Sequence, residues 1–341
     1  MRLFLVSGDA PLQTSRLARA VVSRHGRCGL LDLSGEGLLP EATRFDVLQE
    51  LEQRWPALCV QLAEWLDFLQ LGVPQAHQLP LIPGLDDVLR ALVLLDHCRL
   101  EEHGVLVVLL PACGQAQRFL NGLVSNPELV QQIYLPLIER LSQLKGTLSR
   151  LEGLLNLRLP DSSALALPGS LLAELQQLRQ RLLDPAQCEL QLAMPAIQAG
   201  QSLLAQRIAG FHLSGVQLSR LWLQGAIEHE LLASVAEAWH PAHLLHTLGD
   251  DDFEAAAPAW LSLPWQGETE LQETSDADGT VVISLLLPGL SKQQLQVQRV
   301  GQALQVRQGP LRRSYPLPSS CFALAPCGAR VAGRRLEVRF R

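Results

Sequence analysis

The chain has 341 residues, of which 48% are hydrophobic and 18% are charged. This balance excludes a disordered protein and is typical of a globular chain with a large core and two domains. The formal net charge is −6, but the residues from Leu271 onward carry ten basic and four acidic side chains, so this tail is basic and the remainder is acidic. Because the arginines of the tail lie on apparent strands, we expect a solvated or domain-facing surface and no nucleic-acid partner.

The N-terminal residues, the lengths of the apolar stretches and the cysteines bear on the cellular compartment. Residues 1–6 are too short an apolar run for a signal peptide, and no uninterrupted apolar stretch approaches the roughly 18 residues of a membrane-spanning helix. The seven cysteines are odd in number and form no CxxC motif, which is typical of reduced, mostly buried thiols. We therefore expect a soluble, cytoplasmic protein that is not integral to a membrane.

Residues 3–18 (LFLVSGDAPLQTSRLA) form a short apolar run, a turn and the start of an amphipathic helix. A strand that leads through a tight turn into a helix is where α/β proteins bind phosphate. On the template of a P-loop, Gly8 is the first glycine and Ser15 is the hydroxyl on the metal side, whereas Gln13 and Thr14 replace the second glycine and the lysine. The stretch is either a vestigial nucleotide loop or an ordinary strand–turn–helix corner.

Residues 105–110 are an apolar run typical of a central parallel strand, and residues 29–33, 189–194, 215–221 and 259–265 resemble further strands of the sheet. The apolar period predicts helices over residues 45–71 and from Pro83 onward, and the acidic run 250–254 predicts a helix start or a solvated linker. The expected fold class is α/β, with a doubly wound, mostly parallel sheet in residues 1–266.

Leucines spaced by three and four residues predict a helical hairpin in an insertion over about residues 128–188. They are Leu137, Leu141, Leu144, Leu148, Leu151 and Leu155, followed beyond a turn by Leu171, Leu175, Leu178 and Leu182. On pattern alone, two such helices can bury their leucines against the sheet of the same chain.

From Thr280 the hydrophobic period changes to two. Short strands at regular spacing are predicted over residues 281–287, 295–299, 303–307, 311–317 and 335–340. This pattern predicts a small antiparallel β-sandwich over residues 280–341. The polar, turn-rich residues 267–279 are predicted to be the linker that precedes it.

The N-terminal region resembles the arsenite-pump ATPases (ArsA) and the related targeting factors for tail-anchored membrane proteins, which are P-loop NTPases. That family carries G-K-G-G-V-G-K-T where this chain has residues 8–15, so Asp9 stands in place of an additional lysine. Residues 83–87 (PGLDD) are similar to a Pro-Gly-x-Asp-Glu segment of the family, and Gly114 fits a loop that follows the central strand. Leu109 stands where the family has the aspartate that supports magnesium.

The tail is similar to an α-crystallin, or small heat-shock protein, domain. The segments that carry this resemblance are LLLPGLSKQQLQV, GQALQVRQG, RRSYPLP and GRRLEVRF. An ArsA-like domain followed by such a tail resembles a photosynthetic-lineage branch of the targeting-factor family.

The resemblance implies a homodimer, ATP and magnesium as cofactors, and a water-positioning carboxylate at Asp32 or Glu36. It also implies that the leucines from Leu137 to Leu155 line an apolar groove for a client's transmembrane segment. However, one misplaced charge about 4 Å from a phosphate costs roughly 4 kcal/mol at an effective dielectric near 20. With Asp9 and Thr14 in place of two lysines, we expect no cofactor and no catalytic residue.

The leading hypothesis is therefore an ATPase-deficient homologue that binds hydrophobic segments or protein partners as a chaperone or adaptor. Two alternatives stay open. One is an ATPase of the same family that uses Ser15 for magnesium and Asp32 or Glu36 for water, and the other is a purely structural adaptor without an apolar groove. His240, His243 and His246 are too loosely spaced for a tetrahedral metal site without a carboxylate, so we expect no metal.

Overall fold

The computed structural model describes residues 1–37, 39–68, 84–100, 103–125, 169–198, 200–239, 243–276, 279–290, 292–293 and 295–341. The chain divides into two compact units. The first comprises Met1–Arg44, Glu101–Ser125 and Gln180–Arg341, and the second comprises Phe45–Leu100 and Asn126–Arg179. None of the described helices combines the length and the apolar character that crossing a bilayer requires.

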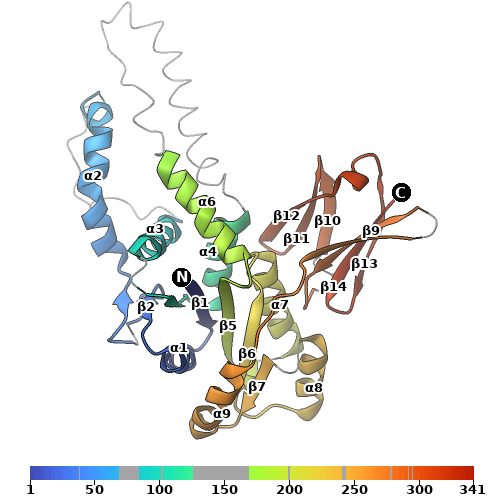
Figure 1. Ribbon diagram of the computed structural model, residues 1–341, viewed down its shortest axis with the longest axis horizontal. Helices are drawn as coiled ribbons and strands as arrows, with labels where there is room; N and C mark the ends of the chain where they lie inside the picture. The colour runs from blue at the N-terminus through green and yellow to red at the C-terminus, as the bar shows by residue number, and fades with distance from the viewer. Residues whose placement is uncertain are drawn as a thin grey trace, which may run out of the picture. The chain divides into compact units, whose positions relative to one another are not determined.

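The first unit contains a seven-stranded sheet with the order β3-β2-β4-β1-β5-β6-β7 (Figure 1). All of its neighbouring strands are parallel. The strands are β1 (Arg2–Gly8), β2 (Gly29–Asp32), β3 (Thr43–Arg44), β4 (Val105–Leu109), β5 (Cys188–Pro195), β6 (Leu218–Gln224) and β7 (Leu244–Thr247). The strands β1, β4 and β5 are buried on both faces along most of their length, as expected in the middle of a parallel sheet. The predicted α/β class with a parallel sheet is confirmed.

Helices cover both faces of this sheet (Figure 1). They are α1 (Pro11–His25), α4 (Cys113–Ser125), α7 (Gln201–Leu213), α8 (His229–Ala238) and α9 (Asp250–Ser262). Helices α1 and α9 pack against each other, as do α4 and α7. The core between the sheet and α9 includes Trp222, whose ring stacks on that of Phe253 at 3.8 Å.

One predicted strand is wrong. Residues 259–265 form no strand, because α9 continues to Ser262. The buried side chains Phe253, Ala257 and Trp260 lie four and three residues apart, which is the spacing of one helix face. The last strand of the sheet is β7. Neither β7 nor the two-residue strand β3 was predicted from the sequence.

The seven remaining strands of the first unit form two antiparallel sheets, with orders β10-β11-β12 and β13-β14-β9-β8. They are β8 (Leu271–Ser275), β9 (Val281–Leu286), β10 (Leu295–Val300), β11 (Ala303–Gln308), β12 (Leu311–Pro316), β13 (Pro326–Ala332) and β14 (Arg335–Phe340). Both sheets contribute to one core, which includes Ile283, Leu304 and Phe340. The small β region is therefore confirmed, but β8 lies within residues 267–279, which were predicted as a linker, and β13 was not predicted.

The β-sandwich contacts α7 through a buried arginine. Arg313 of β12 donates hydrogen bonds to the carboxylate of Glu270 and to the backbone oxygen of His212, the latter at 3.0 Å. The neighbouring Leu213 belongs to the core of the sandwich. Burial, and then the charges of Arg313 and Arg334, lower the pKa of His212 to about 3, so this imidazole is neutral at physiological pH.

The second unit contains α2 (Val47–Phe68), α3 (Leu85–Leu100) and most of α6 (Gly169–Leu183). The predicted helices over residues 45–71 and from Pro83 onward correspond to α2 and α3. In the first turn of α3, Asp86 and Asp87 both pair with Arg90, at 2.6 and 3.1 Å. Leu171, Leu175, Leu178 and Leu182 lie on α6 as predicted, whereas Leu137, Leu141, Leu144, Leu148, Leu151 and Leu155 lie outside the described residues.

Candidate functional site

The candidate site is the corner between β1 and α1, at the carboxyl edge of the sheet. Only Asp9 and Ala10 connect the strand to the helix, because α1 begins at Pro11. Proline suits the first position of a helix, since its fixed φ is helical and it has no N–H to leave unbonded. Residues 11–13, which correspond to part of the wrapping loop of a P-loop, are therefore helical in this chain.

Thr14, at the position of the P-loop lysine, and Ser15, at the position of the metal-side hydroxyl, both bond to backbone oxygens at the start of α1. Thr14 donates from Oγ1 to the backbone oxygen of Ala10 at 3.0 Å, and Ser15 donates from Oγ to that of Leu12 at 2.9 Å. Both residues are buried. A hydroxyl that coordinates magnesium has to face the ligand, and these two face the backbone of their own helix.

Gly8 has a packing role at this corner. A Cβ atom at this position would lie 2.4 Å from the backbone oxygen of Ala193 on β5 and 2.4 Å from Oγ1 of Thr14. Real Cβ atoms do not approach other atoms so closely, so no larger residue fits without a shift of the backbone. Close packing of β1, β5 and α1 is sufficient to explain this glycine.

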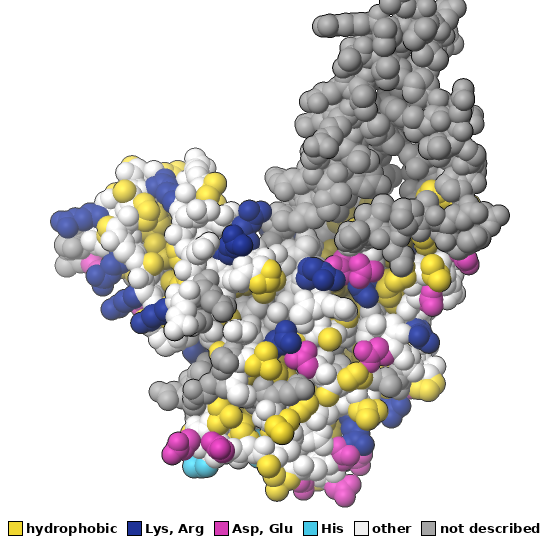
Figure 2. Space-filling model, turned by 180° about the vertical axis from the view of Figure 1, so that it is seen from behind, with side chains coloured by type: hydrophobic (Ala, Val, Ile, Leu, Met, Phe, Trp, Pro, Cys, Tyr) yellow, Lys and Arg dark blue, Asp and Glu magenta, His cyan; other side chains and the backbone are white. Residues whose placement is uncertain are grey.

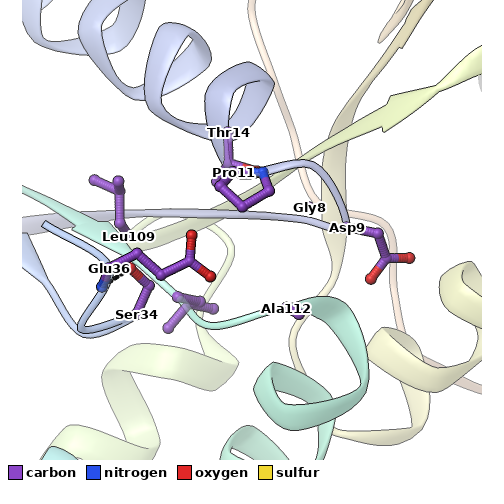
Figure 3. Close-up of a pocket in the computed structure, with 9 residues that line it drawn as sticks. Gly8, Asp9, Pro11, Thr14, Ser34, Glu36, Leu109 and Ala112 are labelled. Atoms are coloured by element: carbon purple, nitrogen blue, oxygen red, sulfur yellow. Dashed lines mark hydrogen bonds between the residues drawn. The ribbon is translucent and has the colours of Figure 1, made fainter. Parts of the chain in front are cut away.

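Asp9 faces away from the corner toward α4 and α7 (Figure 3). Its Oδ1 accepts a hydrogen bond from the backbone N–H of Cys113, the first residue of α4, at 3.2 Å. Its Oδ2 lies 3.1 Å from Nε of Arg207 on α7. The carboxylate thus occupies the N-terminus of α4, where the helix dipole favours a negative charge. Gly114 is the second residue of α4. A Cβ atom added at this position would lie 3.5 Å from Nη1 of Arg207, which is an ordinary contact distance.

Asp32 and Glu36, the two candidate carboxylates, have different surroundings. Asp32 is fully buried, and it accepts hydrogen bonds from the backbone N–H groups of Ser34 at 2.9 Å and Gly37 at 3.0 Å. It thereby fixes the conformation of the loop that follows β2. Glu36 is exposed, and its carboxylate extends below Pro11 and Thr14 (Figure 3).

A small pocket lies at this corner, with a volume of about 80 Å³. Its lining brings together Gly8, Asp9, Pro11, Thr14, Ser34, Glu36, Leu109, Leu110 and Ala112. Pockets that bind small organic ligands usually measure about 300–1,000 Å³. The buried side chain of Leu109 adds an apolar wall at the end of β4, and a charged triphosphate gains nothing from such a wall.

A series of hydrogen-bonded polar side chains joins α1 to the last residue of β6 and the first residue of α9. Nε2 of Gln13 donates to Gln224 at 2.7 Å, and Gln224 donates to Asp250 at 2.5 Å. Arg16 forms an ion pair with the same Asp250. Gln13, which replaces the second glycine of the P-loop, is therefore part of the packing between α1 and the sheet.

The histidines do not assemble into a metal site within the part of the chain that the structure describes. His246 bonds through Nε2 to the backbone oxygen of Gly225 at 2.7 Å, and His243 lies edge-on to Trp265 at 5.1 Å. His240 is outside the described residues.

The residue that sequence reasoning missed at this corner is Arg207. It is separated from Asp9 by 198 residues, and no local motif marks it. Its one trace in the sequence is that Asp9 is an acid where the family has a base, because a shielded acid needs a basic partner elsewhere in the chain.

Comparison with known proteins gives two findings. Residues 278–340 match the family model of the HSP20-like domain found in ArsA. Over 326 residues, the chain is 27% identical to an uncharacterised protein of Streptomyces coelicolor, an alignment that covers 88% of this chain and 81% of the other. The first finding supports a relation to ArsA-like proteins, and the matched residues contain β9–β14.

Proposed function

We propose that this protein is an ArsA-like chaperone or adaptor that binds hydrophobic segments or partner proteins without hydrolysing ATP. The relation to ArsA-like proteins rests on the match of the C-terminal domain. The loss of nucleotide chemistry rests on the corner between β1 and α1. The single observation that carries it is the early start of α1 at Pro11, which leaves only Asp9 and Ala10 to connect strand and helix.

This geometry is unsuited to a polyphosphate for a physical reason. A P-loop holds phosphates with several backbone N–H groups that point inward and with a lysine. Here the N–H of Thr14 already donates to the oxygen of Ala10 at 3.0 Å, and no lysine stands at position 14. The nearby N-terminus of α4 is occupied by the carboxylate of Asp9, so the chain supplies its own anion at that helix.

The alternative of an ATPase with non-standard residues has less support. Ser15 would have to give up its hydrogen bond to Leu12 before it could hold magnesium. Asp32 would have to release the loop it organises before it could position a water molecule. Of the two candidate carboxylates, Asp32 and Glu36, only Glu36 is exposed at the pocket, and a carboxylate repels a phosphate.

Calorimetric titration with ATP and with ADP, each in the presence of magnesium, tests the first half of this proposal. We expect no saturable heat at nucleotide concentrations up to the millimolar range, and phosphate release no faster than the background. Binding at micromolar concentration would contradict the proposal and favour the ATPase alternative.

The second half is tested by binding of a labelled apolar peptide to the full chain, with nucleotide and without it. We expect the same affinity in both conditions. The structural adaptor predicts no binding of such a peptide in either condition. The homodimer and the leucine-lined groove implied by the family resemblance stay predictions.

A further inference from the structure

Three large apolar side chains are exposed at the carboxyl edge of the parallel sheet. Leu12 is 68% exposed, Ile197 is 91% exposed and Leu248 is 70% exposed. Each follows a different strand: Leu12 lies in the first turn of α1 after β1, Ile197 just beyond β5, and Leu248 just beyond β7. Single exposed apolar residues are common on protein surfaces, but several at one edge indicate an interaction surface.

Strand register and hydrogen bonds place these residues at the same edge. Pro195 of β5 is in register with Gln224 of β6, and Gln224 is in register with Thr247 of β7. The side chain of Gln224 also accepts the hydrogen bond from Gln13, the neighbour of Leu12. Ile197 and Leu248 follow the ends of β5 and β7, the two neighbours of β6, by two residues and one residue. All three residues therefore lie near the end of β6.

Acidic side chains accompany this apolar group. The loops that leave β6 and β7 open into α8 and α9, whose first turns are acidic. The exposed carboxylates at this edge are Glu36, Glu228, Glu230, Asp251 and Asp252. The described arginines near this edge include Arg16, Arg44 and Arg207, which bond to Asp250, to the backbone oxygen of Gly35 and to Asp9. Figure 2 shows Asp and Glu side chains beside hydrophobic ones at the lower end of the body, where α8 and α9 lie.

We propose that this edge is a docking surface for a segment of a partner protein that carries large apolar side chains flanked by lysines or arginines. Leu12, Ile197 and Leu248 provide the apolar area that such a segment buries. The exposed carboxylates around them favour lysines or arginines on either side of it. This inference rests on the proposed function, because it assigns a surface and a partner class to the same binding activity. The surface consists of residues at the strand ends and does not involve the insertion.

The test uses the full chain and two synthetic helical peptides with the same leucine-rich core, one flanked by lysines and one by glutamates. Fluorescence anisotropy should show that the lysine peptide binds at least about tenfold more tightly, and that the difference shrinks at high salt. Ile197→Ser and Leu248→Ser should each weaken its binding by about tenfold. Glu228→Gln with Glu230→Gln should reduce the preference for lysine.

The matched control is Val300→Ser, because Val300 is 53% exposed on the sandwich and away from this edge. We expect this variant to bind the lysine peptide within about twofold of the unaltered chain. All the variants alter exposed side chains, and thermal melting checks that each is folded.

The possible failures are distinguishable. If the lysine peptide binds but Ile197→Ser and Leu248→Ser leave its affinity unchanged, the docking surface is refuted and the proposed function survives. If neither peptide binds, both proposals fail. If neither peptide binds and sedimentation shows a dimer that Ile197→Ser converts to a monomer, the occupant of this edge is a second copy of the chain.

Discussion

The carboxylate of Asp9 bonds to Arg207, with Oδ2 3.1 Å from Nε, while its other oxygen accepts the backbone N–H of Cys113. Three elements, the β1–α1 connection, α4 and α7, therefore meet at one charge. The side chains of both partners are largely shielded from water, at 15% and 25% exposed. In a chain that lacks the lysine of a P-loop, this acid serves to hold the corner together.

Breaking this pair should destabilise the fold. Arg207→Ala leaves the Asp9 carboxylate without its cation, so we expect the free energy of unfolding in urea to fall by about 1–2 kcal/mol. A double-mutant cycle with Asp9→Ala should give a coupling of about 1 kcal/mol, because both side chains retain some contact with water. The exposed pair of Arg19 and Glu41, 3.7 Å apart, is the control and should give a coupling close to zero. Equal coupling energies for the two pairs would contradict this account.

Restoring the lysine should not restore nucleotide binding. In Thr14→Lys, the new ammonium group replaces a buried hydroxyl in a helix that still begins at Pro11, so the backbone donors of a P-loop are still missing. We expect no ATP binding by calorimetry, and a loss of stability of about 2–4 kcal/mol from the buried charge. Leu12→Lys, two residues earlier and exposed, is the folded control and should melt near the temperature of the unaltered chain. ATP binding by Thr14→Lys would show that charge alone had been limiting.

Gly8 and Gly122 should respond in opposite ways to alanine. At Gly8 a Cβ would lie 2.4 Å from Ala193 and from Thr14. At Gly122, inside α4, an added Cβ would meet no atom of the described residues within 4 Å, apart from the helix's own nearby backbone. We expect Gly8→Ala to cost about 1–3 kcal/mol of unfolding free energy, and Gly122→Ala to add about 0.5–1 kcal/mol through helix propensity. Urea denaturation measures both. A harmless Gly8→Ala would mean that β1 and β5 can separate, and that packing does not require this glycine.

The parallel sheet was predictable where a strand is buried on both faces. Residues 105–110 are a continuous apolar run, and they correspond to β4. The edge strands β8 and β13 are largely exposed, so the buried–exposed alternation that identifies a strand is weak there. The error over residues 259–265 has a related cause, because a short apolar run does not distinguish a strand from the end of a buried helix.

The site was predictable in its local chemistry and not in its long-range contacts. The residues at positions 9, 13 and 14 differ in type from the family's P-loop, and Leu109 replaces its magnesium-supporting aspartate. The partners Arg207 and Gln224 are brought to the corner by α7 and β6. Their sequence separation leaves no periodicity or motif that links them to the corner.

The stability of the protein should depend on pH through His212. Its pKa lies near 3 in the folded chain, against an ordinary value of 6.5, because burial and then Arg313 and Arg334 oppose its charged form. The unfolded chain therefore binds an additional proton below pH 6.5, and stability falls as the pH decreases from 6.5 toward 3. We expect this residue alone to cost up to about 1.4 kcal/mol per pH unit over that window. Urea denaturation at several pH values should show a shallower acid slope for His212→Gln, whereas His229→Gln, at an exposed position in α8, should leave the slope unchanged. Identical slopes for His212→Gln and the unaltered chain would mean that the imidazole does gain a proton in the folded state.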